Sequence, residues 1–237
     1  MTTVSVDLAY RSYSDIGVAI LDFSRSAARV TFHRLNHARE PQATDLASLI
    51  ATVCSDVGAR TLLLDGPQAW KDPANGLEHS RQCERELNAP AKTGLPGTVK
   101  PRNYIPFVSF AIDVFDELAF HGWQRYDGTR LPASKVVAES LPLSAWRSLG
   151  MPILPAKRKC SNVIIEQRAA ELSKRFRLKL DKMPNHDELQ AVVAGLAGRA
   201  LEQGFLSSLR ISGVAPFIHE RKCREGFIVN PMDVYAC

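Results

Sequence analysis

Four acidic residues occupy positions where the ends of chain segments could gather them, namely Asp7, Asp65, Glu139 and Asp187. Each one alone suits an ordinary solvated carboxylate, because Asp is common in turns and in the first turn of a helix. Brought together, three or four carboxylates would repel one another unless cations lay between them. Mg²⁺ and Mn²⁺ prefer carboxylate oxygen and keep bound water. The four residues therefore predict a site for Mg²⁺ or Mn²⁺.

A site of this kind can hydrolyse a phosphodiester. Two divalent ions about 3.5–4 Å apart can activate a water molecule and stabilise the leaving oxygen. We therefore expect the four acids to act both as metal ligands and as catalytic residues. The leading hypothesis is a metal-dependent nuclease, a phosphodiesterase that acts on structured nucleic acid.

The apolar pattern predicts the elements that would position these acids. Residues 4–10, 16–23 and 28–35 read as strands joined by short polar links, which indicates an antiparallel meander. The runs at 61–64 and 135–139 read as buried strands that end at Asp65 and Glu139. Helical spacing predicts helices at 44–57, 81–87, 105–122, 145–149, 161–177 and 186–203.

A meander that then switches to strands linked by helices is typical of the RNase H-like fold. The predicted fold class is α/β, an RNase H-like mixed sheet with three antiparallel strands, then parallel crossover strands, flanked by helices. In this layout the first strand lies beside the strand that ends at Asp65, and the final helix starts near the same place. Functional groups in such sheets gather at the carboxyl ends of the strands. The fold would therefore bring Asp7, Asp65 and Asp187 together.

The size and composition suit one large globular domain. The chain has 237 residues, of which 45% are hydrophobic, enough for a sizeable core. We expect residues 1–237 to form a single RNase H-like domain. The segment at about 68–104 is rich in Pro, Gly, Lys and Arg and has little periodicity, so it predicts a loop-rich insertion.

Other features predict a cytoplasmic protein. The five cysteines show no zinc-ligand spacing and suit reduced thiols. The N-terminus lacks the layout of a signal peptide. The longest apolar stretch, at 105–123, contains Asp113, Asp116 and Glu117, which a membrane span would not tolerate. No membrane association is expected.

Basic residues are the candidates for nucleic-acid binding. The formal charge of +5 is mildly basic and suits a polyanionic partner. Arg81 and Arg85 would share one face of a short helix, and guanidinium groups bind phosphate well. Lys157, Arg158 and Lys159 form a denser cluster that suits a DNA or RNA backbone. A solvated charged surface explains either group equally well.

Six segments of the sequence, in order, resemble domain-of-unknown-function family 429. They are residues 6–10 (VDLAY), 64–70 (LDGPQAW), 81–85 (RQCER), 137–142 (VAESLP), 186–187 (HD) and 225–231 (EGFIVNP). Members of that family are described as predicted nucleases of RNase H fold, related to the Holliday-junction resolvase type. The resemblance covers nearly the whole chain. It implies the same four acids as the site, and it leaves a homodimer open because a junction is symmetric.

The sequence departs from this family beside Asp187. Relatives often carry a second acid three residues further along the helix, where this chain has Gln190. A neutral amide oxygen would weaken a second metal position, and Glu188 points about 100° away from Asp187. His186 is an auxiliary candidate that could ligate metal or accept a proton, although a helix-capping histidine is commoner.

Two other classes of protein stay open. A non-catalytic nucleic-acid-binding or adaptor domain could keep this fold, and Gln190 favours that interpretation. An ATP-dependent phosphotransferase of the actin-like superfamily shares the fold core but needs a glycine-rich first hairpin. Residues 7–12 contain no glycine, which argues against that class.

Overall fold

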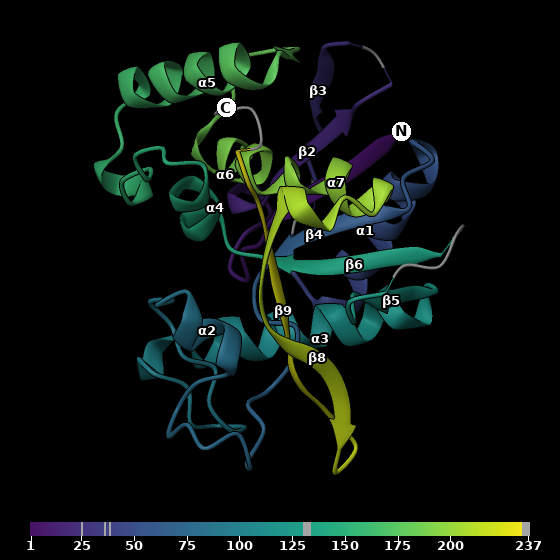
Figure 1. Cartoon of the computed structure of the whole chain (residues 1–237), viewed down its shortest axis with the longest axis vertical. Helices are drawn as coiled ribbons and strands as arrows, with labels where there is room; N and C mark the ends of the chain where they lie inside the picture. Colours follow the sequence, from purple (N-terminus) through teal and green to yellow (C-terminus); the bar gives the residue numbers. More distant parts are fainter. Residues whose placement is uncertain (25, 36, 38, 130–133, 234–237) are drawn as a thin grey trace.

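The computed structural model describes residues 1–24, 26–35, 37, 39–129 and 134–233 of the protein. Within these residues, nine strands form one mixed sheet in the order β7-β3-β2-β1-β4-β6-β9-β8, with β5 paired to β6 beside this path. Figure 1 shows this sheet with helices packed around it. The sheet determines where the predicted acids lie.

The central strands follow the predicted topology. Strands β1 (Thr2–Asp7), β2 (Gly17–Asp22) and β3 (Ala28–Phe32) form an antiparallel meander. Strand β1 also pairs in parallel with β4 (Thr61–Asp65), which pairs in parallel with β6 (Lys135–Ser140). This is the RNase H-like mixed sheet that the sequence pattern predicts.

Four strands were not predicted. They are β5 (Trp123–Arg125), β7 (Leu178–Leu180), β8 (Leu209–His219) and β9 (Lys222–Pro231). The expectation that only helices follow residue 139 is therefore wrong. Strands of three residues, such as β5 and β7, are too short for a periodic signal. Strand β8 contains Gly213 and Pro216 and a register shift against β9, and both residues usually mark a break in a strand.

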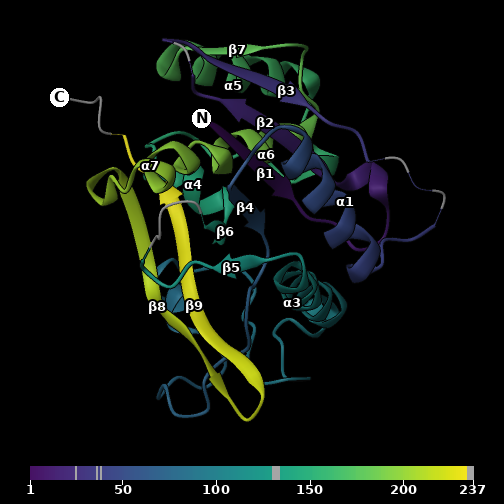
Figure 2. The same cartoon turned by 90° about the vertical axis from the view of Figure 1, so that its right-hand side faces the viewer.

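Helices cover both faces of the sheet. Helices α1 (Ala43–Asp56) and α3 (Ile105–Phe120) pack on one face, and Figure 2 shows them on the same side of β1 and β4. The other face carries α4 (Pro142–Ser148), α5 (Asn162–Phe176), α6 (His186–Gly195) and α7 (Ala197–Gln203). The single helix expected at 186–203 is thus two helices. Short 3-10 turns are η1 (Tyr13–Asp15), η2 (Arg102–Tyr104), η3 (Lys157–Lys159) and η4 (Leu206–Ser208).

Strand β1 shows how the two layers share the sheet. Val4 and Val6 belong to the core formed with α1 and α3. The alternate residues point to the opposite face, as they must in a strand, and Ser5 there lies close to Gly195 of α6. Asp7 continues this second set, so its side chain lies on the face that α6 covers.

The segment 68–104 packs at the same end of the molecule as the outer part of the β8–β9 hairpin. Its one α-helix within the described residues, α2 (Gln82–Glu86), contacts both β8 and β9. Figure 1 shows the loops of this insertion beside the hairpin. The insertion is thus loop-rich as predicted and is held against the sheet.

Two sequence expectations concern the chain as a whole. Among the described residues, no helix combines the length and the apolar character needed to cross a membrane. Cys54, Cys83, Cys160 and Cys223 are free thiols, and Cys237 lies outside the described residues.

Candidate functional site

The carboxyl ends of two central strands bring Asp7 and Asp65 side by side. The two residues are direct partners in the parallel register of β1 and β4. Paired residues on adjacent strands point to the same face, and here the two carboxyl groups share a hydrogen bond. Both side chains remain partly exposed. The pair is therefore accessible to a ligand from outside the sheet.

Burial and mutual repulsion perturb both acids. Burial raises the pKa of Asp7 well above its usual value, and the neighbouring Asp65 charge raises it further. Burial also raises the pKa of Asp65, from 3.8 to about 7, although the hydrogen bond with Asp7 opposes this change. Two carboxyl groups that interact in this way titrate as a pair, and both favour the protonated form more than a free aspartate does. A cation placed between them would displace such a proton.

Helix α6 brings Asp187 towards this pair. The helix starts at a capping box in which the Asn185 side chain accepts from the Glu188 amide, at 2.8 Å. Gly17 of β2, the antiparallel partner of Asp7, lies directly under the first turn. A β-carbon on Gly17 would overlap the Asp187 carbonyl. The missing side chain lets α6 approach closely enough for the Asp187 charge to raise the pKa of Asp7.

Asp187 contacts the side chain of Lys157 with one oxygen and that of His186 with the other. Lys157 Nζ lies 2.5 Å from Asp187 Oδ2 and 2.7 Å from Asp15 Oδ1. His186 Nδ1 lies 3.1 Å from Asp187 Oδ1. Burial raises the pKa of Asp187, but hydrogen bonds from His186 and Lys157 outweigh it, so the pKa lies below its usual value. Asp187 is therefore a charged carboxylate that is already neutralised.

The two auxiliary candidates, His186 and Gln190, contact other protein groups rather than the aspartate pair. His186 Nε2 lies 3.0 Å from the Pro155 carbonyl, so each ring nitrogen faces an oxygen of the protein. Gln190 Oε1, the atom that could ligate metal, accepts a hydrogen bond from Trp146 Nε1 at 2.7 Å. Neither residue offers a free ligand atom to the acids. Their expected auxiliary roles are not supported by this geometry.

Glu139 does not join the aspartate pair on its face of the sheet. In the register of β4 and β6, Glu139 is opposite Leu64, and Ser140 is opposite Asp65. Successive strand residues point to opposite faces, so a difference of one residue separates Glu139 from the pair. Both its oxygens accept from Arg81, at 2.7 Å from Nη1 and 2.6 Å from Nη2. Glu139 is in a buried ion pair rather than a cluster of four acids.

This ion pair also corrects the prediction for Arg81. Only 1% of Arg81 is exposed, and its guanidinium also contacts Glu84. Arg85 is exposed on α2. The two arginines therefore do not present one shared face to phosphate.

Two further buried glutamates lie in this region, and the sequence pattern did not predict their burial. Glu84 accepts hydrogen bonds from Arg81 and Thr93. Glu225 accepts from the Asp72 amide, from Asn75 Nδ2 and from the Gln82 amide, at 3.0, 2.6 and 2.8 Å. These contacts attach the insertion to β9. No local sequence signal distinguishes these glutamates from surface ones, because their partners come from distant segments.

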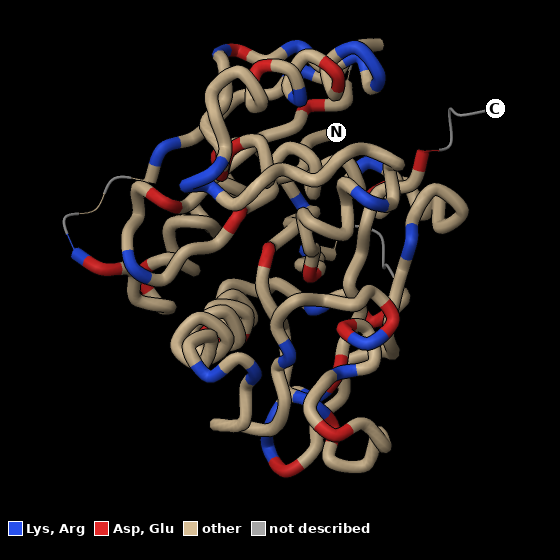
Figure 3. Tube along the Cα trace, turned by 90° about the vertical axis from the view of Figure 1, so that its left-hand side faces the viewer, with Lys and Arg blue, Asp and Glu red and all other residues tan. Residues whose placement is uncertain are grey.

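The second predicted basic group lies beside the acids. Lys157, Arg158 and Lys159 form the exposed turn η3, and Lys157 contacts Asp187 directly. Figure 3 shows basic and acidic residues interspersed along the chain in that view. The turn η3 is therefore a local concentration of positive charge.

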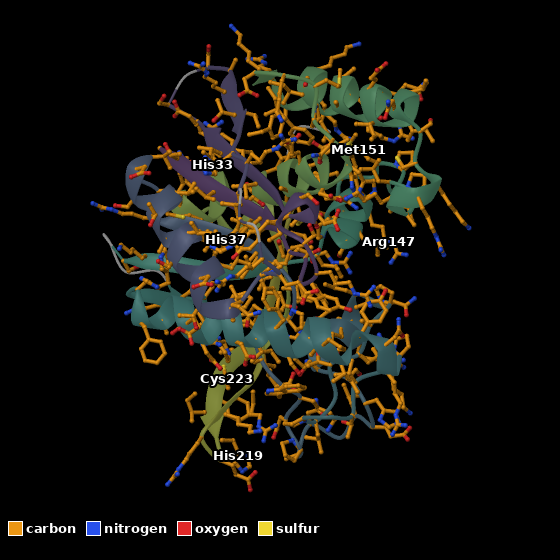
Figure 4. All side chains as sticks on the ribbon, turned by 180° about the vertical axis from the view of Figure 1, so that it is seen from behind. His33, His37, Arg147, Met151, His219 and Cys223 are labelled. Carbon is orange, nitrogen blue, oxygen red and sulfur yellow. The ribbon has the colours of Figure 1, made fainter. Side chains whose placement is uncertain are left out.

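The donor atoms suit one divalent cation better than two. Among the described residues, no group of three or more His, Cys, Asp or Glu side chains is arranged to hold a metal ion. In Figure 4, His33 and His37 lie far from His219, so these three histidines do not form one cluster. Within the described part of the chain, Asp7 and Asp65 form no ion pair with a basic side chain. The space between these two carboxyl groups, at the ends of β1 and β4, is the position that would suit one Mg²⁺ or Mn²⁺ ion.

A cavity of about 530 Å³ opens next to Asp65. Its lining combines aromatic, polar and charged side chains, including Tyr10, Arg11, Asn103, Tyr104, Phe107 and Glu139. Arg11 stacks over the Tyr10 ring, 5.2 Å from its centroid. The cavity is large enough for part of a substrate that reaches the sheet edge.

Comparisons with known proteins give one structural likeness. No family model matches this chain, and no curated protein matches its sequence. The chain is similar to a solved structure of RuvC from Thermus thermophilus, with a TM-score of 0.44 and 12% sequence identity. The match covers 86% of this chain and 97% of that one.

Proposed function

We propose that this protein is a metal-dependent nuclease that hydrolyses phosphodiester bonds in structured nucleic acid. The observation that carries the proposal is the pair Asp7 and Asp65, two carboxyl groups with raised pKa at the ends of adjacent central strands. Strongly perturbed acids at such a position mark functional sites. Membership of domain-of-unknown-function family 429 is part of the same proposal, and it rests on the six sequence segments.

Asp7 and Asp65 would hold one Mg²⁺ or Mn²⁺ ion. Such an ion, when bound, supplies positive charge to a phosphate and lowers the pKa of a coordinated water. The two aspartates would orient this position, because neighbouring strands of the sheet fix their backbones. Asp187 lies close enough to influence Asp7, and it holds Lys157 at the same edge.

The substrate would lie across the sheet edge beside Asp65. The cavity there offers Tyr10, Tyr104 and Phe107 for contact with bases or sugars. Arg158 and Lys159, exposed on η3, would contact phosphates on the side of Asp187. Basic and aromatic groups on two sides of the acids suit DNA or RNA.

A cleavage assay tests the proposal. Purified protein is incubated with labelled duplex, hybrid and branched substrates, with Mg²⁺, with Mn²⁺ or with a chelator. We expect metal-dependent cleavage that Asp7→Asn and Asp187→Asn abolish while both variants keep the wild-type circular dichroism spectrum. Lys135→Ala, at the exposed opposite end of β6, is the control that keeps activity. Cleavage that persists unchanged in both aspartate variants would refute the proposal.

One observation favours a second candidate, a non-catalytic nucleic-acid-binding domain. Asp187 is neutralised by Lys157, and Gln190 is bound to Trp146, so two of the expected ligands are engaged by the protein itself. This class predicts salt-sensitive binding of DNA or RNA with no turnover in any divalent metal. The same substrates, measured for binding as well as cleavage, distinguish the two.

A further inference from the structure

The four predicted acids divide into two that have protein cations and two that do not. Asp187 is paired with Lys157, and Glu139 with Arg81. Asp7 and Asp65 face each other and share a hydrogen bond. A two-ion site would need Asp187 or Glu139 as ligands for its second ion. Protein side chains already supply positive charge at both of these positions.

Lys157 is the cation on the same face as the aspartate pair. Its Nζ lies between Asp187 Oδ2 at 2.5 Å and Asp15 Oδ1 at 2.7 Å. The charge of Lys157 also reaches Asp7, whose pKa it lowers against the effect of burial. Arg81 is different, because it is buried on the other face with Glu139. Lys157 lies beside Asp187, and about half of its side chain is exposed to solvent.

Asp15 explains why Lys157 stays at this position. A lysine beside a single carboxylate at a surface is held weakly. Here two carboxylates from different elements, η1 and α6, bind one ammonium group. An ammonium group is a compact point charge, so it can neutralise carboxylates as a small cation does.

We propose that Lys157 supplies the second positive charge of the site, so that one divalent ion binds, at Asp7 and Asp65. This inference rests on the proposed function, and it names the residue that replaces the second ion of a two-ion site. It also explains how the chain tolerates Gln190 where an acid would serve a second metal. Lys157 is accordingly a functional residue beyond the nucleic-acid contact that the sequence predicted.

Mn²⁺ binding, measured by isothermal titration calorimetry and by electron paramagnetic resonance, tests this inference without any activity. We expect wild-type protein to bind one Mn²⁺ ion and Lys157→Ala to bind two, because Asp15 and Asp187 lose their ammonium partner. Lys157→Arg keeps the charge and should bind one. Lys135→Ala is the matched control for loss of an exposed lysine and should also bind one.

Cleavage supplies a second readout. Lys157→Ala should be slower by about 100-fold at limiting Mn²⁺, the usual size for loss of one electrostatic stabiliser. Excess Mn²⁺ should restore much of this rate, because a second ion can then take the vacated place. The wild-type rate should change little over the same range above saturation.

The outcomes separate this inference from the proposed function. Two ions bound by wild-type protein, or one ion bound by both wild type and Lys157→Ala, would overturn the role of Lys157 and leave a metal site in place. Absence of Mn²⁺ binding in wild-type protein at millimolar concentration would overturn the proposed function itself. A change from one ion to two supports both.

Discussion

Two acidic regions of this protein lie close together and have opposite character. At the sheet edge, Asp7 and Asp65 face each other and have no basic partner among the described residues. Beneath the insertion, Glu84, Glu139 and Glu225 are fully buried, and each accepts several hydrogen bonds. The carboxylate group therefore has a structural role in one region and a candidate functional role in the other. The presence or absence of a basic partner decides which role it has.

The difference follows from the cost of burying charge. An ionised carboxylate away from water is stable only when it is paired and hydrogen-bonded. The three glutamates meet this requirement with Arg81 and backbone amides, so they fasten the insertion to the sheet. The aspartate pair forms no ion pair with a basic side chain among the described residues. That unmet requirement leaves the pair ready to accept a cation.

The largest effect is expected from removing Arg81. Arg81→Met leaves Glu84 and Glu139 buried without their cation, and breaking a buried ion pair costs about 3–5 kcal/mol. Urea denaturation followed by circular dichroism should show a loss of this size in the free energy of unfolding. Arg85→Ala, four residues along and exposed, should stay within about 0.5 kcal/mol of wild type.

A double variant checks the cause of that loss. Arg81→Met combined with Glu139→Leu removes one of the two unpaired carboxylates, so part of the stability should return. If the double variant is less stable than Arg81→Met alone, packing rather than charge explains the loss. The insertion would then be held by shape and not by its ion pair.

A smaller effect is expected at the contact between the sheet and α6. Gly17→Ala places a β-carbon against the Asp187 carbonyl, and overpacking of this kind costs about 2 kcal/mol. The helix must shift, so Asp187 moves from the aspartate pair. We expect both a lower free energy of unfolding and a weaker Mn²⁺ affinity by calorimetry. An unchanged affinity would show that Asp187 is dispensable for metal binding.

The smallest predicted effect is an increase in the free energy of unfolding. In metal-free buffer, Asp7→Asn removes the repulsion and should stabilise the protein by about 1–2 kcal/mol near pH 8, since one pKa unit corresponds to about 1.4 kcal/mol. Burial and the Asp65 charge raise the folded pKa of Asp7 well above its usual value, so through this group, which the variant lacks, the wild-type folded state binds more protons than the unfolded state above about pH 4. Wild-type stability therefore falls relative to the variant as pH rises through this range.

Denaturation curves of both proteins from pH 4 to pH 8 measure this difference. It should be small near pH 4, where the pair is protonated, and it should grow towards pH 8. Saturating Mg²⁺ should stabilise wild-type protein and should do much less for Asp7→Asn. A pH-independent difference would show that the two carboxyl groups do not interact as described.

The amino-acid sequence alone determined the central elements and part of the site. Alternation and apolar runs identified β1, β4 and β6, because side-chain burial in a sheet has a strict period. The acids Asp7 and Asp65 were identified because they stand at the ends of these strands, where parallel pairing makes them meet. The start of α6 was predicted at residue 186, directly after Asn185, and the structure places it there.

Only the tertiary structure decided which acids act together and which cation each one has. A shift of one residue between β4 and β6 sends Glu139 to the opposite face, and single-strand patterns do not specify register. Arg81 reaches Glu139 across 58 residues of sequence, and Lys157 reaches Asp15 across 142. Local propensity carries no information about such pairs, because the energy that selects them arises only when distant segments exclude water from one place.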